Sequence, residues 1–294
     1  MMVGFVESDH SVVFMKNKIA ITECPRDAIQ GLHDFIPTEK KIKYINFLLK
    51  SHLFDCIDFG SFVSPKAIPQ MSDTAKVLSG LELDSNSAKL LAIIANERGA
   101  DDACQFEEIT YLGYPFSISE TFQIRNTNAT IAQSLERVKV IQNIATKANK
   151  ELVIYISMGF GNPYGDEWNA EIAMQWVDEL SKLEIKTFSL ADTIGIANPE
   201  SIKYLFSNLI PNYPKLTFGG HFHTTPDSWL AKIEAAYGAG CRMFDAAILG
   251  YGGCPMAQDD LVGNMPTENL LNYFEMSDNQ RVDELKLAFT ELIS

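Results

Sequence analysis

Short apolar segments alternate with longer segments of helical periodicity along most of the chain. The apolar segments are rich in β-branched side chains and are bounded by turn-forming residues, which is typical of buried strands. Predicted strands cover residues 18–24, 53–59, 89–95, part of 106–111, 152–157, 185–190, 216–221 and 242–246. After Lys89, the third of these contains only apolar residues, as expected of a strand that is buried on both faces.

Helical segments follow most of these strands. One helix is predicted to begin at the N-cap candidate Thr38 and another at Ser72, because both side chains can accept a hydrogen bond from a first helical turn. Further helices are predicted over 97–104, 130–149, a segment ending at residue 183, 201–209, 226–238, 267–274 and 281–292. Residues 25–36 and 117–128 are predicted to be loops.

Strands and helices thus alternate eight times, at about 30 residues per unit. Such alternation predicts a parallel (β/α)8 TIM barrel, which belongs to the α/β fold class. No low-complexity linker interrupts the pattern, so we expect a single domain over residues 1–294. The segments after the eighth strand would supply the eighth helix and a short C-terminal helical extension.

Composition and charge narrow the range of partners. The net charge of -14 disfavours nucleic acid and anionic membranes, since both require a basic surface. No apolar run approaches the roughly 18 to 20 residues of a membrane span. Residues 1–14 include Glu7 and Asp9 but no Arg, which argues against a secretory signal or transit peptide. Five cysteines without paired spacing suit a reducing compartment, so we expect a cytoplasmic protein without disulfides.

Polar side chains collect where the predicted strands end. In a TIM barrel the loops after the strands share one cavity, so these side chains are expected to meet. They are Arg26, Asp27 and Gln30 after the first strand, Asp58, Ser61 and Lys66 at the second, Asp192 and Thr193 after the sixth, His221 and His223 at the end of the seventh, and Cys254 and Asn264 after the eighth.

His221 and His223 are candidate metal ligands. Side chains two positions apart in a strand point to the same face, so the two imidazoles can converge on one divalent cation. A hydrogen-bonded polar pair is an equally frequent arrangement. Asp27 and Asn264 would complete a set of oxygen and nitrogen ligands, which suits Mg²⁺ or Mn²⁺ and leaves Zn²⁺ or Co²⁺ open. Alternatively, Asp27 caps a helix and Asn264 shapes a turn.

Arg26 and Cys254 are candidates for the chemistry itself. Arg26 is a cation beside the proposed ligand Asp27 and could stabilise an oxyanion or an enolate, although a surface salt bridge would also explain it. Cys254 follows a glycine-rich segment, 250–253, that could move as a lid. An inert buried thiol is the alternative, but Cys56 and Cys241 fit that description better because they lie in apolar strands.

Five stretches match one group of enzymes in order and in spacing. They are Pro25-Arg26-Asp27 with Gln30; Ser61-Phe62-Val63-Ser64-Pro65-Lys66 with Pro69-Gln70-Met71; Asp192-Thr193-Ile194-Gly195; His221-Phe222-His223; and Gly252-Gly253-Cys254-Pro255 with Gly263-Asn264 and Thr267-Glu268. Over about residues 19–274 the chain resembles the hydroxymethylglutaryl-CoA lyase family, within a wider group of metal-dependent barrel lyases and Claisen-type synthases. The second and last stretches are features of the lyases rather than of the synthases.

The resemblance implies a reaction and a role for each matched residue. A hydroxyacyl-CoA such as hydroxymethylglutaryl-CoA would be cleaved to acetoacetate and acetyl-CoA, a step of leucine degradation. The implied catalytic residues are Arg26, which stabilises the enolate, Asp27, His221 and the lid thiol Cys254. The implied ligands of Mg²⁺ or Mn²⁺ are Asp27, His221, His223 and Asn264, and the small-molecule acyl-CoA or hydroxyacid would contact Gln30, Asp58, Ser61, Asp192 and Thr193. The resemblance leaves a homodimer open.

Several positions depart from the family pattern. Asp58 stands where the lyases carry Glu, and Gly31-Leu32-His33 replaces Asn-Glu-Lys, which removes a cation expected to help bind CoA. Thr224-Thr225-Pro226-Asp227 replaces Asp-Thr-Tyr-Gly, and Asp259-Asp260-Leu261-Val262 replaces Gly-Ala-Ser, placing two carboxylates where CoA phosphates would approach. Two alternatives therefore remain. One is a related aldolase or Claisen-type enzyme for another hydroxyacyl or oxoacid substrate, and the other is a non-catalytic barrel that binds a metal or ligand.

Overall fold

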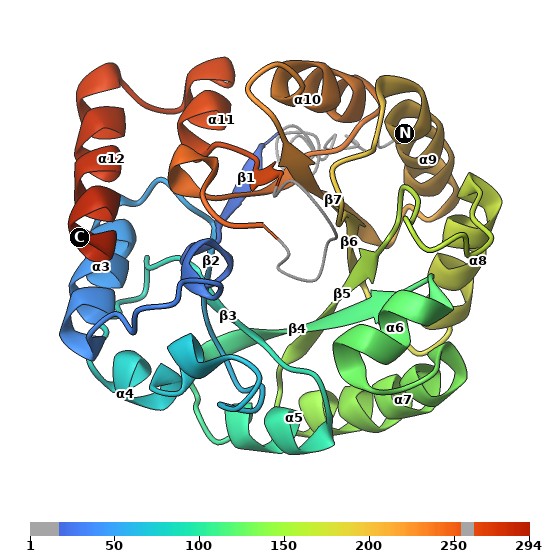
Figure 1. Cartoon of the computed structure of the whole chain (residues 1–294), viewed down its shortest axis with the longest axis horizontal. Coiled ribbons are helices and arrows are strands. Elements are labelled where there is room, and N and C mark those ends of the chain that lie inside the picture. Colours follow the sequence, from blue (N-terminus) through green and yellow to red (C-terminus); the bar gives the residue numbers. More distant parts are fainter. Residues whose placement is uncertain (1–17, 254–261) are drawn as a thin grey trace, which may run out of the picture.

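Eight parallel strands close into a ring in the computed structural model, which describes residues 18–253 and 262–294 (Figure 1). The strands are β1 (Ala20–Glu23), β2 (Cys56–Ser61), β3 (Lys89–Ile93), β4 (Ile109–Ser117), β5 (Glu151–Ser157), β6 (Thr187–Asp192), β7 (Thr217–Thr224) and β8 (Met243–Ala246). Each strand pairs with the next in the chain, and β8 pairs with β1, with Met243 opposite Ala20. The predicted (β/α)8 barrel is confirmed.

Helices form the outer ring of the barrel (Figure 1). They are α3 (Thr38–Ser51), α4 (Thr74–Ser79), α5 (Glu97–Ala103), α7 (Ile131–Lys147), α8 (Ala170–Ser181), α9 (Pro199–Asn212), α10 (Trp229–Gly238), α11 (Thr267–Tyr273) and α12 (Asn279–Ile293). Short helical segments directly follow four of the strands: α2 (Pro25–Ile29) after β1, the 3-10 turn η1 (Pro69–Met71) after β2, α6 (Glu120–Thr127) after β4, and the 3-10 turn η2 (Ile248–Gly250) after β8. The C-terminal helix α12 packs against α3. Among the described residues, no helix has the length and apolar character needed to cross a membrane.

Successive strand residues alternate between the barrel interior and the helical layer. Leu91 and Ile93 of β3 cluster with Val153 and Tyr155 of β5. Phe116 of β4 belongs instead to the large core that includes the helices, and its ring lies 5.2 Å from that of Trp176 in α8. This alternation is the period of two that a pleated strand imposes.

The predicted bounds of the fourth strand are wrong. The strand runs from Ile109 to Ser117 rather than within 106–111. Gly113 and Pro115 lie inside it, and both residues are uncommon in central strands. The predicted loop 117–128 contains helix α6, whose N-cap is Ser119. Likewise, α2 lies within the predicted loop 25–36.

Both predicted N-caps are also wrong. Helix α3 begins at Thr38 itself, and the Thr38 hydroxyl donates to Asp73 Oδ2 at 2.8 Å. Helix α4 has Asp73 rather than Ser72 at its N-cap. A tertiary contact has thus replaced the local hydrogen bond that the residue type favours.

A short strand, β9 (Gly263–Asn264), pairs antiparallel with β7 and was not predicted. It sets Asn264 opposite His223. β7 itself extends beyond the predicted residue 221 to Thr224, so both histidines lie inside the strand. The segment after β8 is therefore tied to the strand that carries the histidines.

Candidate active site

Three side chains converge at the carboxyl ends of β1 and β7. One ligand atom each from Asp27, His221 and His223 lies within 4.8 Å of the others. Asn264 joins them, because its Nδ2 donates to Asp27 Oδ2 at 2.8 Å. The four residues predicted to bind a divalent cation are therefore neighbours.

His223 is oriented as a metal ligand would be. Its Nδ1 lies 2.9 Å from the Thr193 carbonyl oxygen, which can only accept, so Nδ1 carries the proton and donates. Nε2 then presents a lone pair, and this buried atom has no hydrogen-bond partner within 18–253 and 262–294. Burial and the nearby His221 lower the pKa of His223, which favours the neutral ring that metals require. A buried, unpartnered lone pair beside a carboxylate fits a divalent cation.

His221 is held from the other side by Asp245 of β8. The distance from His221 Nδ1 to Asp245 Oδ2 is 3.2 Å, and the same oxygen accepts from Ser189 Oγ at 3.0 Å. Burial alone would lower the pKa of His221, but the hydrogen bond and charge of Asp245 outweigh it and raise that pKa. Because Asp245 engages Nδ1, Nε2 is the nitrogen that remains for a ligand or a proton.

Asp27 is held ionised by its neighbours. Its Oδ1 accepts from Arg26 Nη1 at 2.9 Å and from Gln30 Nε2 at 2.8 Å. Burial would raise the pKa of Asp27, but Arg26, both histidines and Asn264 lower it to about 2. Asp27 lies within α2, whose N-cap is Cys24, so the alternative of a helix cap is not supported.

Arg26 is buried, with 9% of its surface exposed, which rules out a surface salt bridge. Its Nε and Nη2 lie 3.0 Å and 2.6 Å from Asp58 Oδ2. Burial raises the pKa of Asp58 to about 6, although Arg26 acts in the opposite direction. The bonds to Asp58 and Asp27 use three of the five guanidinium N–H groups, and the other two have no partner among residues 18–253 and 262–294.

The residues predicted to contact substrate fall into two groups. Gln30 and Asp58 bond directly to the Arg26 and Asp27 pair, as described above. Ser61, Asp192 and Thr193 are buried and bond to the chain itself: Ser61 Oγ accepts from Val63 N, Asp192 accepts from Ala197 N and Lys232, and Thr193 Oγ1 accepts from Met158 N. Their visible contribution is to hold the loops in place.

The glycine-rich segment after β8 reaches the site at Gly252. This residue has φ +88°, and a Cβ there would lie 2.7 Å from the Asp27 carbonyl oxygen. Only glycine therefore fits where this segment crosses α2. Cys254, the predicted lid thiol, lies outside the described residues.

Three buried charged residues near the site were not predicted: Glu23, Lys232 and Asp245. Glu23 is fully buried, its Oε1 accepts from Ile248 N at 3.1 Å, and its Oε2 lies 2.5 Å from Thr267 Oγ1. Burial raises the pKa of Glu23 to about 8. The only signal in the sequence was a charged residue within an apolar segment, and such a residue does not reveal its distant partner.

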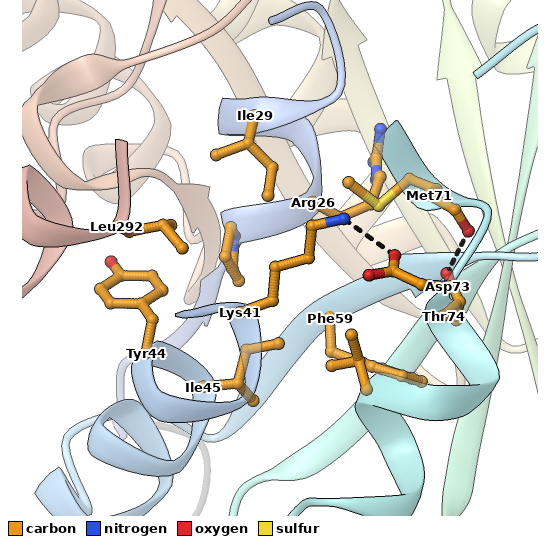
Figure 2. A pocket seen from close by; sticks show the side chains of 12 residues that line it. Arg26, Ile29, Lys41, Tyr44, Ile45, Phe59, Met71, Asp73, Thr74 and Leu292 are labelled. Carbon is orange, nitrogen blue, oxygen red and sulfur yellow. Dashed lines mark hydrogen bonds and ion pairs between the residues drawn. The ribbon is translucent and has the colours of Figure 1, made fainter. Parts of the chain in front are cut away.

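A small cavity lies behind Arg26, between α2, α3 and α4 (Figure 2). Its volume is about 10 Å³, enough for about one water molecule, so it is not a substrate site. Lys41 and Asp73 form an ion pair in its wall, with 2.8 Å between Nζ and Oδ1. This pair braces the wall behind Arg26.

The fold and these contacts define a (β/α)8 barrel with a candidate divalent-metal centre beside a buried arginine. A family model described as HMGL-like matches residues 18–293. The chain belongs to this HMGL-like family.

Individual relatives agree over nearly the whole chain. The chain is 34% identical to the hydroxymethylglutaryl-CoA lyase of Bacillus subtilis over 275 residues, 92% of this chain and 91% of the relative. It is 33% identical to the 3-hydroxy-3-isohexenylglutaryl-CoA/hydroxymethylglutaryl-CoA lyase of Pseudomonas aeruginosa, over 87% of this chain and 85% of the relative. An HMG-CoA lyase from Acinetobacter baumannii, solved with coenzyme A and 3-methylmalate, superposes with a TM-score of 0.86 at 31% identity, covering 94% of this chain and 92% of that one.

Proposed function

We propose that this protein is a carbon–carbon lyase that cleaves hydroxymethylglutaryl-CoA to acetoacetate and acetyl-CoA. The observation that carries the proposal is the cluster of Asp27, His221 and His223, with ligand atoms within 4.8 Å, beside the buried Arg26. Relatives that resemble the chain over most of its length are named as lyases for this substrate.

Asp27, His221, His223 and the Oδ1 of Asn264 are the groups that would hold Mg²⁺ or Mn²⁺. When bound, such a cation polarises the hydroxyl and carbonyl oxygens of a chelated substrate. The donor set contains oxygen and imidazole nitrogen without thiolate, which suits these hard cations.

Cleavage requires a base for the tertiary hydroxyl proton at C3 of the substrate. Asp27, with a pKa of about 2, is a weak base, so the raised pKa of His221 favours the imidazole. Since Asp245 engages Nδ1, His221 has only Nε2 with which to accept a proton or bind the cation. If His221 takes the proton, Asp27, His223 and Asn264 remain as the protein ligands.

Loss of that proton leads to breakage of the C2–C3 bond. The O–H electron pair becomes the ketone C=O of acetoacetate, and the C2–C3 pair moves to C2 as the acetyl-CoA enolate. Arg26 has two N–H groups left to donate to the enolate oxygen, where a preorganised charge lowers the barrier. A proton returned to C2 from Cys254 or His221 completes acetyl-CoA.

We place this reaction in leucine degradation in the cytoplasm. The argument for the compartment is the cysteine usage, and the four described cysteines, Cys24, Cys56, Cys104 and Cys241, are free thiols. A reducing environment keeps such thiols unpaired.

A second candidate is a related lyase for another hydroxyacyl thioester. It is favoured by Gly31-Leu32-His33, where the family carries a cation, and the His33 side chain is fully exposed beside Asp34. It is also favoured by the acidic pair Asp259 and Asp260, which lies outside the described residues.

The test is a product assay on a panel of hydroxyacyl-CoA esters, including hydroxymethylglutaryl-CoA and 3-hydroxy-3-isohexenylglutaryl-CoA. The proposal expects acetoacetate and acetyl-CoA in equal amounts from the first ester, loss of activity with a chelator and recovery with Mg²⁺ or Mn²⁺. Cleavage only of another ester would support the second candidate. Mn²⁺ binding without cleavage of any ester would indicate a non-catalytic barrel.

A further inference from the structure

Lys232 of α10 is a buried ammonium group that the proposed reaction does not use. Only 3% of the residue is exposed. Its Nζ donates to Asp192 Oδ2 at 2.6 Å, to the Gly195 carbonyl at 2.9 Å and to the His223 carbonyl at 2.8 Å. All three N–H donors are therefore satisfied, and they join the turn after β6 to the end of β7.

The turn that Lys232 holds is closed around Asp192. The second oxygen of Asp192 accepts from Ala197 N at 2.9 Å, and Gly195 N donates to the Asp192 carbonyl at 3.0 Å. Gly195 has φ +74°, a conformation that favours glycine. With both oxygens occupied, Asp192 is committed to this turn and to Lys232.

The same turn orients His223. The carbonyl of Thr193, next to Asp192, accepts the proton on His223 Nδ1 at 2.9 Å. This bond sets the tautomer that leaves Nε2 as the buried, unpartnered atom of the cluster. Lys232 therefore acts on His223 in two ways. It donates to the His223 carbonyl, and it holds the turn that supplies the Thr193 carbonyl.

The His221 side chain is held by groups that do not belong to the Lys232 turn. Its Nδ1 is held by Asp245, which in turn accepts from Ser189. A change at Lys232 should consequently alter one of the two imidazoles and leave the other in place.

We propose that Lys232 is a positioning residue for the metal centre, which sets the tautomer and direction of the His223 imidazole through the Asp192–Gly195 turn. The inference rests on the metal site of the proposed function, but not on its substrate. Residues that orient a metal ligand typically change metal affinity by about 10- to 100-fold when they are lost. A residue that only stabilises the fold would leave metal affinity and tautomer unchanged in the folded protein.

The experiment measures Mn²⁺ affinity by electron paramagnetic resonance, and the imidazole tautomers of the metal-free protein by ¹⁵N NMR. Two variants are compared. One is the single variant Lys232→Met. The other is the double variant Lys232→Met/Asp192→Asn, which avoids an unpaired buried carboxylate if the single variant fails to fold. Lys41→Met is the matched control. Lys41 is equally buried, pairs with Asp73 at 2.8 Å and donates to the Gln70 carbonyl, without contacting a proposed ligand (Figure 2).

We expect both Lys232 variants to raise the Mn²⁺ dissociation constant by about 10- to 100-fold. His223 should become a mixture of tautomers, while His221 keeps its tautomer. Lys41→Met should leave the Mn²⁺ dissociation constant and both tautomers as in the wild type. The inference would be overturned if a folded Lys232 variant kept both the wild-type dissociation constant and the wild-type His223 tautomer. It would also be overturned if Lys41→Met had an equal effect, or if the wild type bound no Mn²⁺. A wild type that binds Mn²⁺ but cleaves no hydroxymethylglutaryl-CoA would overturn the proposed substrate while the Lys232 inference stood on these same readouts.

Discussion

The carboxylate of Asp58 holds the guanidinium of Arg26 by three hydrogen bonds. Oδ2 accepts from Nε at 3.0 Å and from Nη2 at 2.6 Å, and Oδ1 accepts from Nε at 3.2 Å. Both side chains are buried, so the pair is little screened by solvent. The pair fixes the direction of the N–H groups that remain for a substrate. Arg26 is thus preorganised, which is what stabilisation of a developing charge requires.

Replacing Arg26 by Gln should lower kcat for hydroxymethylglutaryl-CoA by about 100-fold or more, because one preorganised charge is lost from the transition state. Mn²⁺ affinity should fall by less than kcat, by at most about 10- to 100-fold, because Arg26 bonds to the proposed ligand Asp27 but is not a ligand itself. Steady-state kinetics and a Mn²⁺ titration check the two expectations, with thermal unfolding as the control for folding. An unchanged kcat in the folded variant would remove Arg26 from the chemistry.

The two histidines should separate in their effects. His223→Ala removes the unpartnered Nε2 and should weaken Mn²⁺ binding strongly. His221→Ala should lower kcat by about 10² to 10⁴, the usual contribution of a general base, with the smaller loss of Mn²⁺ affinity. The test is to measure kcat and Mn²⁺ affinity in both variants. If His221→Ala and His223→Ala lose the same amount of kcat and the same amount of Mn²⁺ affinity, His221 serves only as a ligand.

Glu23 should make the protein less stable as the pH rises. Its pKa is raised from 4.5 to about 8 in the folded state, so between these values the unfolded chain releases a proton that the folded chain retains. The free energy of unfolding should therefore fall over this range, by on the order of a few kcal/mol, and level off above about pH 8.

Glu23→Gln should lack this dependence, because the amide stays neutral and can accept from Ile248 N and donate to Thr267 Oγ1. Urea unfolding of wild type and variant at pH 5 and pH 8 measures it, with the exposed Glu200→Gln as the control. A constant difference in unfolding free energy between wild type and Glu23→Gln at the two pH values would contradict the expectation.

The acidic pair in the segment after β8 should hinder a CoA ester. Asp259→Asn with Asp260→Asn should lower KM for hydroxymethylglutaryl-CoA at low salt, because two charges that would repel the CoA phosphates are removed. Added salt should lower the wild-type KM more than that of the variant, since it screens the repulsion. Identical KM values at every ionic strength would separate this segment from CoA recognition.

The sequence alone was sufficient to predict the barrel and the meeting of Asp27, His221 and His223 at one end of it. Eight alternations of strand and helix leave few other topologies, and loops that follow parallel strands must emerge at one end. Side chains alternate between the two faces of a strand, which predicted that His221 and His223 share one face. Asp27 follows the first strand, which predicted that it lies at the same end of the barrel as the histidines. These predictions depended on local periodicity and on a connectivity that the fold class supplies.

Tertiary structure decided the features that depend on distant partners. Pro115 lies within β4 although its residue type argues against a central strand. The Thr38 hydroxyl donates to Asp73 and does not cap its own helix. Lys232 and Asp192 are 40 positions apart, and Glu23 and Thr267 are 244 positions apart. A buried charge must find its counterpart in space, and nothing in local sequence specifies which distant side chain will be adjacent once the ring has closed.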